Sequence, residues 1–225
     1  MMRKVPAAML LLLFLAGCST VPFRETERVP LDSRDALSLV ERFRSDMPDS
    51  FELLNTVVFE YNGRSFTALG TVRINRADRV FQVAGMNPMG IKLFELSGDQ
   101  NSVTARYLIA DFTRHGDIAA AVGNDIRRMY FDLVPGPEAW SWMRNTTLIF
   151  RQSFGAGVLE YVFAGRAGDL IEKRYYEEDG IVWKASYYEY RDQDGKRWPQ
   201  GIVFIHYSHG YRLIVRQKEL HIEHN

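Results

Sequence analysis

The sequence predicts a mainly β protein of the α+β class, with one strongly curved antiparallel sheet or open barrel. Three observations lead to this expectation. Short segments of alternating apolar character, separated by turn residues, fill most of the chain. Only two stretches repeat apolar residues at helical spacing. The 225 residues are enough for one domain with a substantial core. Many short antiparallel strands in succession favour a bent or closed sheet.

The chain begins with the features of a secretory signal. Arg3 and Lys4 supply positive charge, and the apolar run from Ala7 to Leu15 is too short to span a bilayer as a mature helix. The run leads into Gly17 and Cys18. Cys18 is the only cysteine of the chain, so an internal disulfide is excluded.

Residues 15–18, with the sequence Leu-Ala-Gly-Cys, resemble the bacterial lipobox. The resemblance implies removal of residues 1–17 and acylation of Cys18; the alternative is an ordinary signal peptide that contains a cysteine. Each buried methylene of an acyl chain contributes roughly 0.8 kcal/mol, and two or more chains anchor a protein firmly. By resemblance to Gram-negative lipoproteins, Ser19 permits export to the outer membrane. We therefore expect a lipid-anchored protein on the periplasmic face of the outer membrane.

The charge balance excludes one class of partner. The whole chain has 28 basic and 28 acidic side chains, and loss of Arg3 and Lys4 leaves 26 basic side chains. A nucleic-acid partner would need a basic face, so none is expected. The sequence also contains no polybasic run, which assigns membrane contact to lipid and to apolar side chains.

The first half of the chain predicts a tether, a helix and five strands. Residues 18–31 form a lipidated N-terminus and a polar, Pro-containing tether, and residues 32–225 form a single domain. Asp32 or Ser33 caps a helix that Pro48 ends. The strands follow at 55–61, 66–76, 79–85, 91–96 and 102–109.

The second half predicts a further helix and six strands. The helix covers about 116–131, and 133–142 is interpreted as a loop with a short helical turn because of Pro135, Gly136 and Pro137. The strands are expected at 147–153, 158–163, 170–177, 181–191, 202–206 and 211–217. Periodicity alone leaves open whether the sheet encloses a packed core or a partly open apolar cavity.

Residues 81–96 resemble the core of the LolB family of outer-membrane lipoprotein receptors. In that family a strand ends at an Asn-Pro-Leu-Gly loop whose leucine protrudes and helps to hand lipoproteins into the membrane. Here the loop is Asn87, Pro88, Met89 and Gly90, so the resemblance implies a membrane-insertion loop with Met89 in place of leucine. Pro88 fixes its own φ and Gly90 tolerates unusual dihedrals, which favours a rigid loop. The alternative is an ordinary hairpin turn with Met89 folded back on the sheet.

A second similarity covers residues 176–190, where a turn, a strand with a buried Trp183 and a closing Tyr190 follow the family pattern. The resemblance implies a half-barrel of about eleven strands, with helices as a lid over an apolar cavity. Residues 116–142 match the family's lid only loosely. The similarity therefore supports the fold better than the function.

The expected cavity has apolar and aromatic candidate lining residues, any of which can equally be part of a solid core. An apolar lining binds acyl chains without strict geometric demands. The candidates are Phe59, Phe66, Val72, Phe81, Val83, Phe94, Leu96 and Tyr188.

No enzyme, metal or cofactor is expected. His221 and His224 form a terminal H-x-x-H without further ligands, which is weak evidence for a metal site. His206 and His209 flank a strand end and a turn, where solvated histidines are common. The sequence contains no nucleophile elbow around Ser153.

Three functions remain at this stage. The first is a LolB-like receptor that binds acylated lipoproteins in its cavity, receives them from a periplasmic LolA-like carrier and inserts them with Met89. The second keeps the fold but holds another lipid or hydrophobic intermediate. The third is a structural lipoprotein without a ligand.

Overall fold

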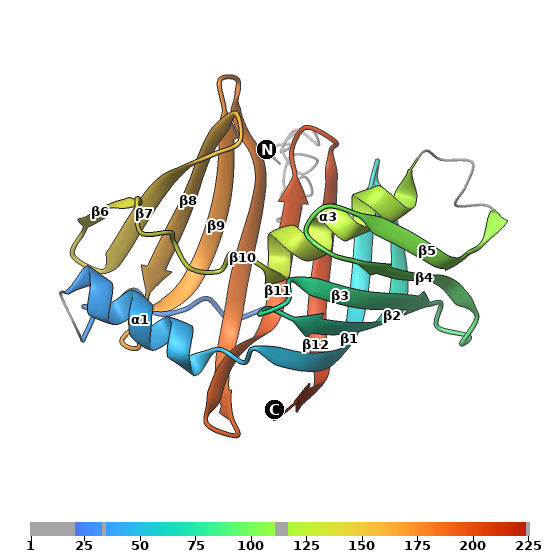
Figure 1. Ribbon diagram of the computed structural model, residues 1–225, viewed down its shortest axis with the longest axis horizontal. Helices are drawn as coiled ribbons and strands as arrows, with labels where there is room; N and C mark the ends of the chain where they lie inside the picture. Colours follow the sequence, from blue (N-terminus) through green and yellow to red (C-terminus); the bar gives the residue numbers. More distant parts are fainter. Residues whose placement is uncertain (1–20, 33–34, 111–116, 224–225) are drawn as a thin grey trace, which may run out of the picture.

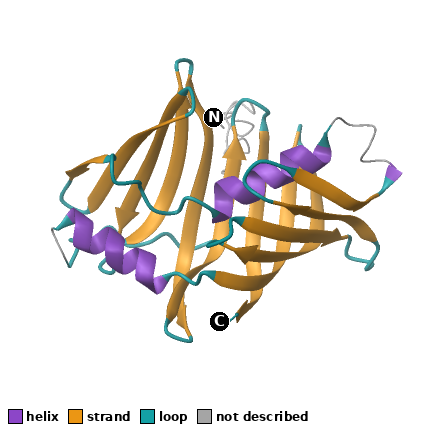
Figure 2. Cartoon of the chain, viewed as in Figure 1, coloured by secondary structure: helices purple, strands orange, loops and turns teal. Residues whose placement is uncertain are grey.

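The computed structural model describes residues 21–32, 35–110 and 117–223 (Figure 1). One twelve-stranded antiparallel sheet carries two helices in this part of the chain (Figure 2). The elements are α1 (Ala36–Asp46), β1 (Ser50–Tyr61), β2 (Arg64–Asn75), β3 (Val80–Met86), β4 (Lys92–Gly98), β5 (Val103–Leu108), α3 (Ile118–Tyr130), β6 (Trp140–Met143), β7 (Thr147–Phe154), β8 (Gly157–Ala164), β9 (Asp169–Glu177), β10 (Gly180–Gln193), β11 (Lys196–His206) and β12 (Tyr211–Ile222).

The sheet consists of two runs of successive hairpins joined at its centre. Its order is β5-β4-β3-β2-β1-β12-β11-β10-β9-β8-β7-β6, so the first and last strands of the chain pair with each other. β5 and β6 form the two edges. Register shifts interrupt five of the pairings, and such bulges bend and twist a sheet. The predicted curved antiparallel half-barrel is confirmed.

The inner face of the sheet, which we define as the face that α1 and α3 cover, carries the main core. Phe43 of α1 packs edge-on against Phe163 of β8, with ring centroids 5.4 Å apart. Tyr130 of α3 stacks on Trp198 of β11 at 6.2 Å. One cluster of buried residues extends through these contacts across both halves of the sheet. A much smaller cluster lies on the outer face around Ile149.

The predicted elements agree with the observed ones except at a few places. Asp35 caps α1 by accepting from the backbone N–H groups of Leu37 and Ser38, so the expected cap at Asp32 or Ser33 is wrong for Asp32, and Ser33 lies outside the described residues. The interval 133–142 contains the start of β6, a strand that the sequence analysis placed in a loop. The sheet therefore has twelve strands rather than about eleven. β11 also begins earlier than expected, at Lys196.

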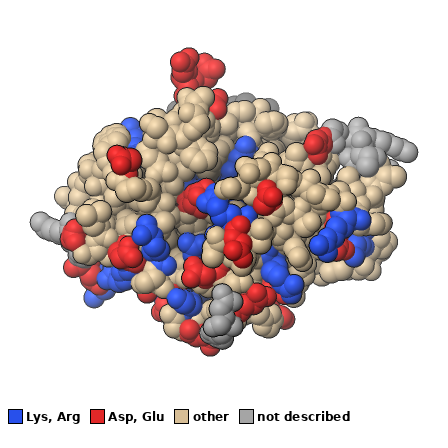
Figure 3. Space-filling view, in the orientation of Figure 1, with Lys and Arg blue, Asp and Glu red and all other residues tan. Residues whose placement is uncertain are grey.

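Two predicted hairpin turns have the backbone that their residues favour. Asn62 and Gly63 have φ of 48° and 71°, and Asp194 and Gly195 have φ of 51° and 72°. Asn-Gly and Asp-Gly pairs accept two consecutive positive φ angles, which match the twist of a hairpin. The acidic turn between β9 and β10 projects from the molecule, as Figure 3 shows at the top of the view.

The N-terminal segment is packed, not free, where the structure describes it. Phe23 is 7 % exposed and stacks on Tyr188 at 5.4 Å. The guanidinium of Arg216 lies 4.5 Å from the centre of the Phe23 ring and donates to the carbonyl of Pro22 at 2.6 Å. The expected tether 18–31 is therefore docked on the sheet from residue 22 onward.

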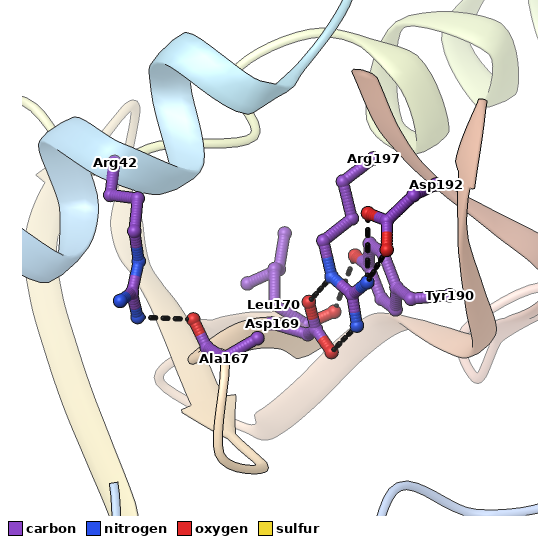
Figure 4. A network of polar contacts seen from close by, with 7 residues as sticks. All are labelled: Arg42, Ala167, Asp169, Leu170, Tyr190, Asp192 and Arg197. Carbon is purple, nitrogen blue, oxygen red and sulfur yellow. Dashed lines mark hydrogen bonds and ion pairs between the residues drawn. The ribbon is translucent and has the colours of Figure 1, made fainter. Parts of the chain in front are cut away.

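A network of polar contacts joins the start of β9, the end of β10 and the start of β11 (Figure 4). Arg197 of β11 pairs with Asp169 at 2.6 Å and with Asp192 at 3.0 Å, which ties the start of β9 to the end of β10. Arg42 of α1 donates to the carbonyl of Ala167 at 2.6 Å. These contacts hold α1 and the neighbouring hairpins together.

Among the described helices, neither is long and apolar enough to cross a membrane.

Candidate functional site

Seven of the eight predicted lining residues lie on the inner face. The strand register places Phe59 opposite Phe66 and Val72 opposite Val83. The same face continues into β4 because Val83 lies opposite Leu96. In a strand, alternate residues point to one face, so Phe81 and Phe94 join this set. The sequence alternation thus gave the correct face for these residues.

The prediction is wrong for Tyr188. The register shows Tyr187 opposite Ile202 on the inner face and Tyr188 opposite Gly201 on the outer face. An added Cβ at Gly201 would lie 2.4 Å from the Phe23 ring, which confirms that Phe23 occupies the outer side here. Glu189, which follows Tyr188, has a positive φ of 54°, and alternation along the sequence does not reveal this local change of direction.

The seven inner-face residues form two groups. Val72, Phe81, Val83 and Leu96 are buried within the core beneath α3. Phe59 and Phe94 are only partly buried, and Phe66 is 43 % exposed. The second group lies nearer to the turn between β1 and β2. The exposure of the apolar inner-face side chains therefore increases toward that end of the sheet. Whether these residues line a cavity for a ligand stays a prediction.

A loop with two exposed apolar side chains lies at the same end of the sheet. Met89 is 80 % exposed, and Ile91 is also exposed. The loop follows Met86, which pairs with Leu69, and so extends beyond the paired part of β3 toward the level of Phe66. The alternative in which Met89 folds back on the sheet is wrong.

Hydrogen bonds within the loop make its shape definite. The side-chain oxygen of Asn87 accepts from the backbone N–H of Met89 at 3.0 Å and from that of Ile91 at 2.9 Å. The backbone N–H of Gly90 donates to the carbonyl of Asn87 at 2.9 Å. Gly90 has φ of 82°, which an L side chain rarely adopts. Asn87 and Gly90 thus fix the loop while Met89 projects.

Helix α3 is held over the inner face by side chains of three strands. The hydroxyl of Tyr187 donates to the carbonyl of Met129 at 3.0 Å. Lys173 is 1 % exposed and donates from Nζ to the carbonyl of Phe131 at 2.7 Å, just beyond the helix end. Burial lowers the pKa of Lys173 to about 7. A cation at a helix C-terminus is favourable, but removing its hydration is costly.

A second polar contact holds α3 near its middle. The hydroxyl of Tyr211 donates to Asp125 at 2.6 Å, and Arg128 pairs with the same carboxylate at 3.1 Å. Burial raises the pKa of Asp125 to about 6. Buried charge of this kind needs its partners, because an unpaired carboxylate in the core is costly. The sequence analysis missed both Lys173 and Asp125, since a single charged residue in a strand or helix is normally solvated.

The expectation that His206 is a solvated histidine is wrong. His206 is buried, and its Nδ1 lies 3.1 Å from Nδ1 of His209. Burial, together with the charge of Arg128, lowers the pKa of His206 to about 4. Within the described ranges, no three His, Cys, Asp or Glu side chains are grouped so as to hold a metal ion. His224 and the lipidation candidate Cys18 lie outside the described residues.

Two surface pockets of about 510 Å³ each occur elsewhere. One lies between the tips of the β1–β2 and β11–β12 hairpins and includes Tyr61 and Arg212. The other lies between the N-terminal segment, α1 and the network around Arg197. None of the predicted lining residues borders either pocket.

Comparison with solved structures supports the fold. A LolA superfamily protein from Nitrosomonas europaea has a TM-score of 0.50 at 10% identity, and the match covers 86% of this chain and 96% of that one. A putative outer membrane lipoprotein-sorting protein domain from Vibrio parahaemolyticus has a TM-score of 0.51 at 8% identity, covering 83% and 92%. A DUF1329 family protein from Desulfovibrio piger has a TM-score of 0.52 at 10% identity, covering 83% and 91%. At such identities the likeness shows the fold alone.

No curated protein matches the sequence. A family described as "Protein of unknown function (DUF3261)" matches residues 52–219, which run from β1 to β12 and span most of the described domain. The expected similarity to LolB in particular is not tested by these matches, whereas the broader similarity to LolA-like proteins is found. The chain therefore belongs to the DUF3261 family and has a LolA-like fold.

Proposed function

We propose that this protein is a lipid-anchored receptor that binds acylated lipoproteins on the inner face of its sheet. Its location is the periplasmic face of the outer membrane, with the anchor on Cys18. The protein acts by binding and not as an enzyme. The observation that carries the proposal is the joint position of the partly buried Phe59, the 43 % exposed Phe66 and the projecting Met89 at one end of the sheet.

The apolar inner face supplies the affinity for acyl chains. A ligand that enters beside Phe59, Phe66 and Phe94 meets aromatic side chains first and the edge of α3 next. Burial of acyl methylenes against these rings is favourable without requiring a fixed geometry. Release toward a bilayer needs no energy source, because acyl chains are equally well accommodated there.

The Met89 loop supplies the contact with the membrane. An exposed methionine gains roughly 1.5–3 kcal/mol when it is fully buried in an apolar medium, which is enough to favour docking and too little to make it permanent. Methionine is also flexible and adapts to irregular surroundings. In this scheme a LolA-like periplasmic carrier delivers the lipoprotein, and the Met89 loop leads its acyl chains into the bilayer.

Acyl binding is tested with the mature chain from residue 18, with Cys18→Ala to prevent acylation. This chain contains all the described elements. We expect saturable fluorescence enhancement of an environment-sensitive acyl probe, and at least fivefold weaker binding after Phe66→Gln. The control is Phe154→Gln, because Phe154 is 45 % exposed, like Phe66 at 43 %, but lies on β7. Phe154 also lies on the inner face but in the other half of the sheet, so absence of saturable uptake, or equal losses in the two variants, would overturn acyl binding beside Phe66.

Depletion of the protein in cells distinguishes the client. Lipoproteins that stall in the periplasm or at the inner membrane support the receptor function. Normal sorting of lipoproteins, together with probe binding in vitro, would overturn the receptor function and point to another lipid as the ligand.

A further inference from the structure

Three cations lie side by side across the outer face of the sheet. The register places Arg174 of β9 opposite Lys184 of β10, Lys184 opposite Ile205, and Ile205 opposite Arg212 of β12. We call Arg174, Lys184 and Arg212 the basic row. With strands about 4.8 Å apart, the row extends roughly 14 Å across the sheet. The sequence contains no polybasic run because these residues come from three separate strands.

Carboxylates contact two of the three cations of the basic row. Arg174 pairs with Glu160 at 3.1 Å and also contacts Glu172. The one ion pair of Arg212 is a long contact of 3.5 Å with Glu60. Its Nε is buried without a hydrogen-bond partner. The side chain of Arg212 is 15 % exposed, so its charge is weakly compensated but only a small part of it faces solvent.

Lys184, which lies between the two arginines in the row, has no carboxylate partner among the described residues. No ion pair or hydrogen bond found among the described residues includes Lys184. Burial lowers its pKa, and Arg174 and Arg212 lower it further, whereas the opposing effect of Glu25 is smaller. The centre of the basic row is therefore a place where an approaching anion relieves repulsion.

The surface beside Arg212 has the side chains expected at a membrane interface. The pocket of about 510 Å³ between the β1–β2 and β11–β12 hairpin tips is bordered by Tyr61, Arg64, Tyr207 and Arg212. Both tyrosines are exposed. Tyrosine rings favour the headgroup level of a bilayer, where the ring and the hydroxyl have different surroundings.

The position of the N-terminal segment brings a membrane close to this surface. Phe23 is docked on the outer face against Tyr188, which lies on the same strand and the same face as Lys184. Five residue steps separate Cys18 from Phe23 along the chain, and an extended segment of that length spans at most about 18 Å between Cα atoms. The closeness of a membrane to Phe23 rests on the proposed lipid anchor at Cys18. The Met89 loop leaves β3 beside Leu69 of β2, on the side of the β1–β2 turn. That turn lies near Arg212, because Glu60, the ion-pair partner of Arg212, is opposite Ser65 at the start of β2.

We propose that the basic row and the adjoining β1–β2 and β11–β12 hairpin tips dock on an anionic phospholipid surface. Lipid phosphates occupy the outer face beside Lys184 and Arg212, while Tyr61 and Tyr207 lie at headgroup level. The docked protein then presents its Met89 loop to the same bilayer. The acyl anchor supplies attachment, and the basic row supplies orientation.

The test uses the mature chain with Cys18→Ala, so that no acyl chain contributes, and flotation with lipid vesicles. Vesicles of phosphatidylethanolamine with one quarter phosphatidylglycerol are compared with vesicles in which phosphatidylcholine replaces phosphatidylglycerol. We expect at least tenfold tighter binding to the anionic vesicles, and weakening at 0.5 M salt as the charges are screened. Lys184→Gln is expected to weaken this binding about fivefold, since each basic residue near such a surface contributes about that factor.

Lys184→Gln also removes a cation that its neighbours repel, so the variant is expected to fold with unchanged or higher thermal stability. The matched control is Lys218→Gln, which removes an exposed lysine of β12 six residues from Arg212. Equal binding to both kinds of vesicle, or equal effects of the two substitutions, would overturn the proposal. Loss of vesicle binding in 5 mM inorganic phosphate at constant ionic strength would also overturn it, because a discrete phosphate site would then explain the row.

The outcome is separable from that of the proposed function. Uptake of the acyl probe by Lys184→Gln is expected to equal that of the unsubstituted chain, since Lys184 is on the outer face. Vesicle binding without probe uptake would contradict acyl binding alone, and probe uptake without a preference for anionic vesicles would contradict the docking surface alone.

Discussion

Strands β1–β5 and strands β7–β11 bend around a shared core, but they use the inner face differently. In the second group, large aromatic side chains such as Tyr161, Phe163 and Phe204 are fully buried, and Phe163 packs against Phe43 of α1. In the first group, Phe66 on the inner face and Met89 in the adjoining loop are exposed. Each group also contains the opposite kind of residue, since Phe81 of β3 is buried and Phe154 of β7 is 45 % exposed, so what distinguishes the first group is the projecting Met89 loop near exposed Phe66.

The two halves also differ in what holds them together. Arg197 fastens the hairpins of the second half through two carboxylates. In the first half the main cover is α3, which contacts β4 and β5 and is held by Lys173 and Tyr187 from the other half. A ligand entering the first half therefore meets the side of the molecule with fewer buried aromatic contacts, where displacement of side chains costs less.

The largest expected effect on stability is that of Phe163→Ala. Phe163 is fully buried and contacts Phe43 and Phe150, so its truncation is expected to lower the free energy of unfolding by about 3–5 kcal/mol. Phe66→Ala is the comparison, with an expected loss below about 1 kcal/mol because much of its ring is already exposed. Urea unfolding measures both. Similar losses in the two variants would show that the halves do not differ as described.

The next effect depends on pH and concerns Lys173. Its pKa is about 7 in the folded protein, against 10.5 as its usual value. The unfolded chain thus binds the proton more tightly, so stability is greatest above pH 10.5, falls by up to about 1.4 kcal/mol per pH unit as the pH drops from 10.5 to 7, and levels off below 7. Lys173→Met is expected to flatten this dependence in urea unfolding from pH 6 to pH 10. An unchanged slope in the variant, with exposed Lys218→Met as the control, would assign the dependence to other groups.

A smaller effect is expected for Gly90→Ala in the Met89 loop. The positive φ of Gly90 is strained for alanine by about 1–2 kcal/mol, although no atom lies where the new Cβ would be. Gly195→Ala, with φ of 72° and similarly open surroundings at the β10–β11 turn, is the matched control. Both variants are expected to lose similar stability, whereas transfer of acyl probe to vesicles slows only in Gly90→Ala. Equal transfer rates would show that the shape of the loop is unimportant.

The smallest effect on stability is expected for Met89→Glu. Because Met89 is 80 % exposed, the free energy of unfolding is expected to change by less than about 0.5 kcal/mol. Delivery of cargo to a bilayer is expected to fail, since a carboxylate does not enter the acyl region, and probe binding stays intact. Met89→Leu is expected to retain delivery. Loss of probe binding in Met89→Glu would mean that Met89 has a structural part in the binding face.

Much of the fold was predictable because local chemistry dominates it. Alternating apolar residues in β1–β4 gave the strands and their common face, and Asn62-Gly63 gave a hairpin. The four-residue strand β6 was missed, because Pro135 and Pro137 favour a loop and the strand depends on its pairing with β7. Tyr188 was assigned to the wrong face because the positive φ of Glu189 interrupts the alternation between Tyr188 and Tyr190, and no turn motif marks this position.

The candidate site was predictable only in part, for a similar reason. The Asn87–Gly90 motif indicated a tight loop, and its side-chain and backbone hydrogen bonds are local. The burial of Lys173 and Asp125, in contrast, arises from contacts between α3 and distant strands. Lys173 donates to a carbonyl 42 positions away and Asp125 accepts from a hydroxyl 86 positions away, and the nearby partner Arg128 does not by itself indicate that Asp125 is buried.

The sequence by itself determined the curved antiparallel sheet, its two helices, the inner-face pattern and the exposed loop around Met89, because each follows from short-range periodicity or turn chemistry. It also predicts the anchor at Cys18. Only the tertiary structure decided that β1 pairs with β12, that Phe23 is docked on the outer face, and that Arg174, Lys184 and Arg212 form one row. The physical reason is that pairing between distant strands sets which side chains become neighbours, and burial and charge at these positions depend on those neighbours.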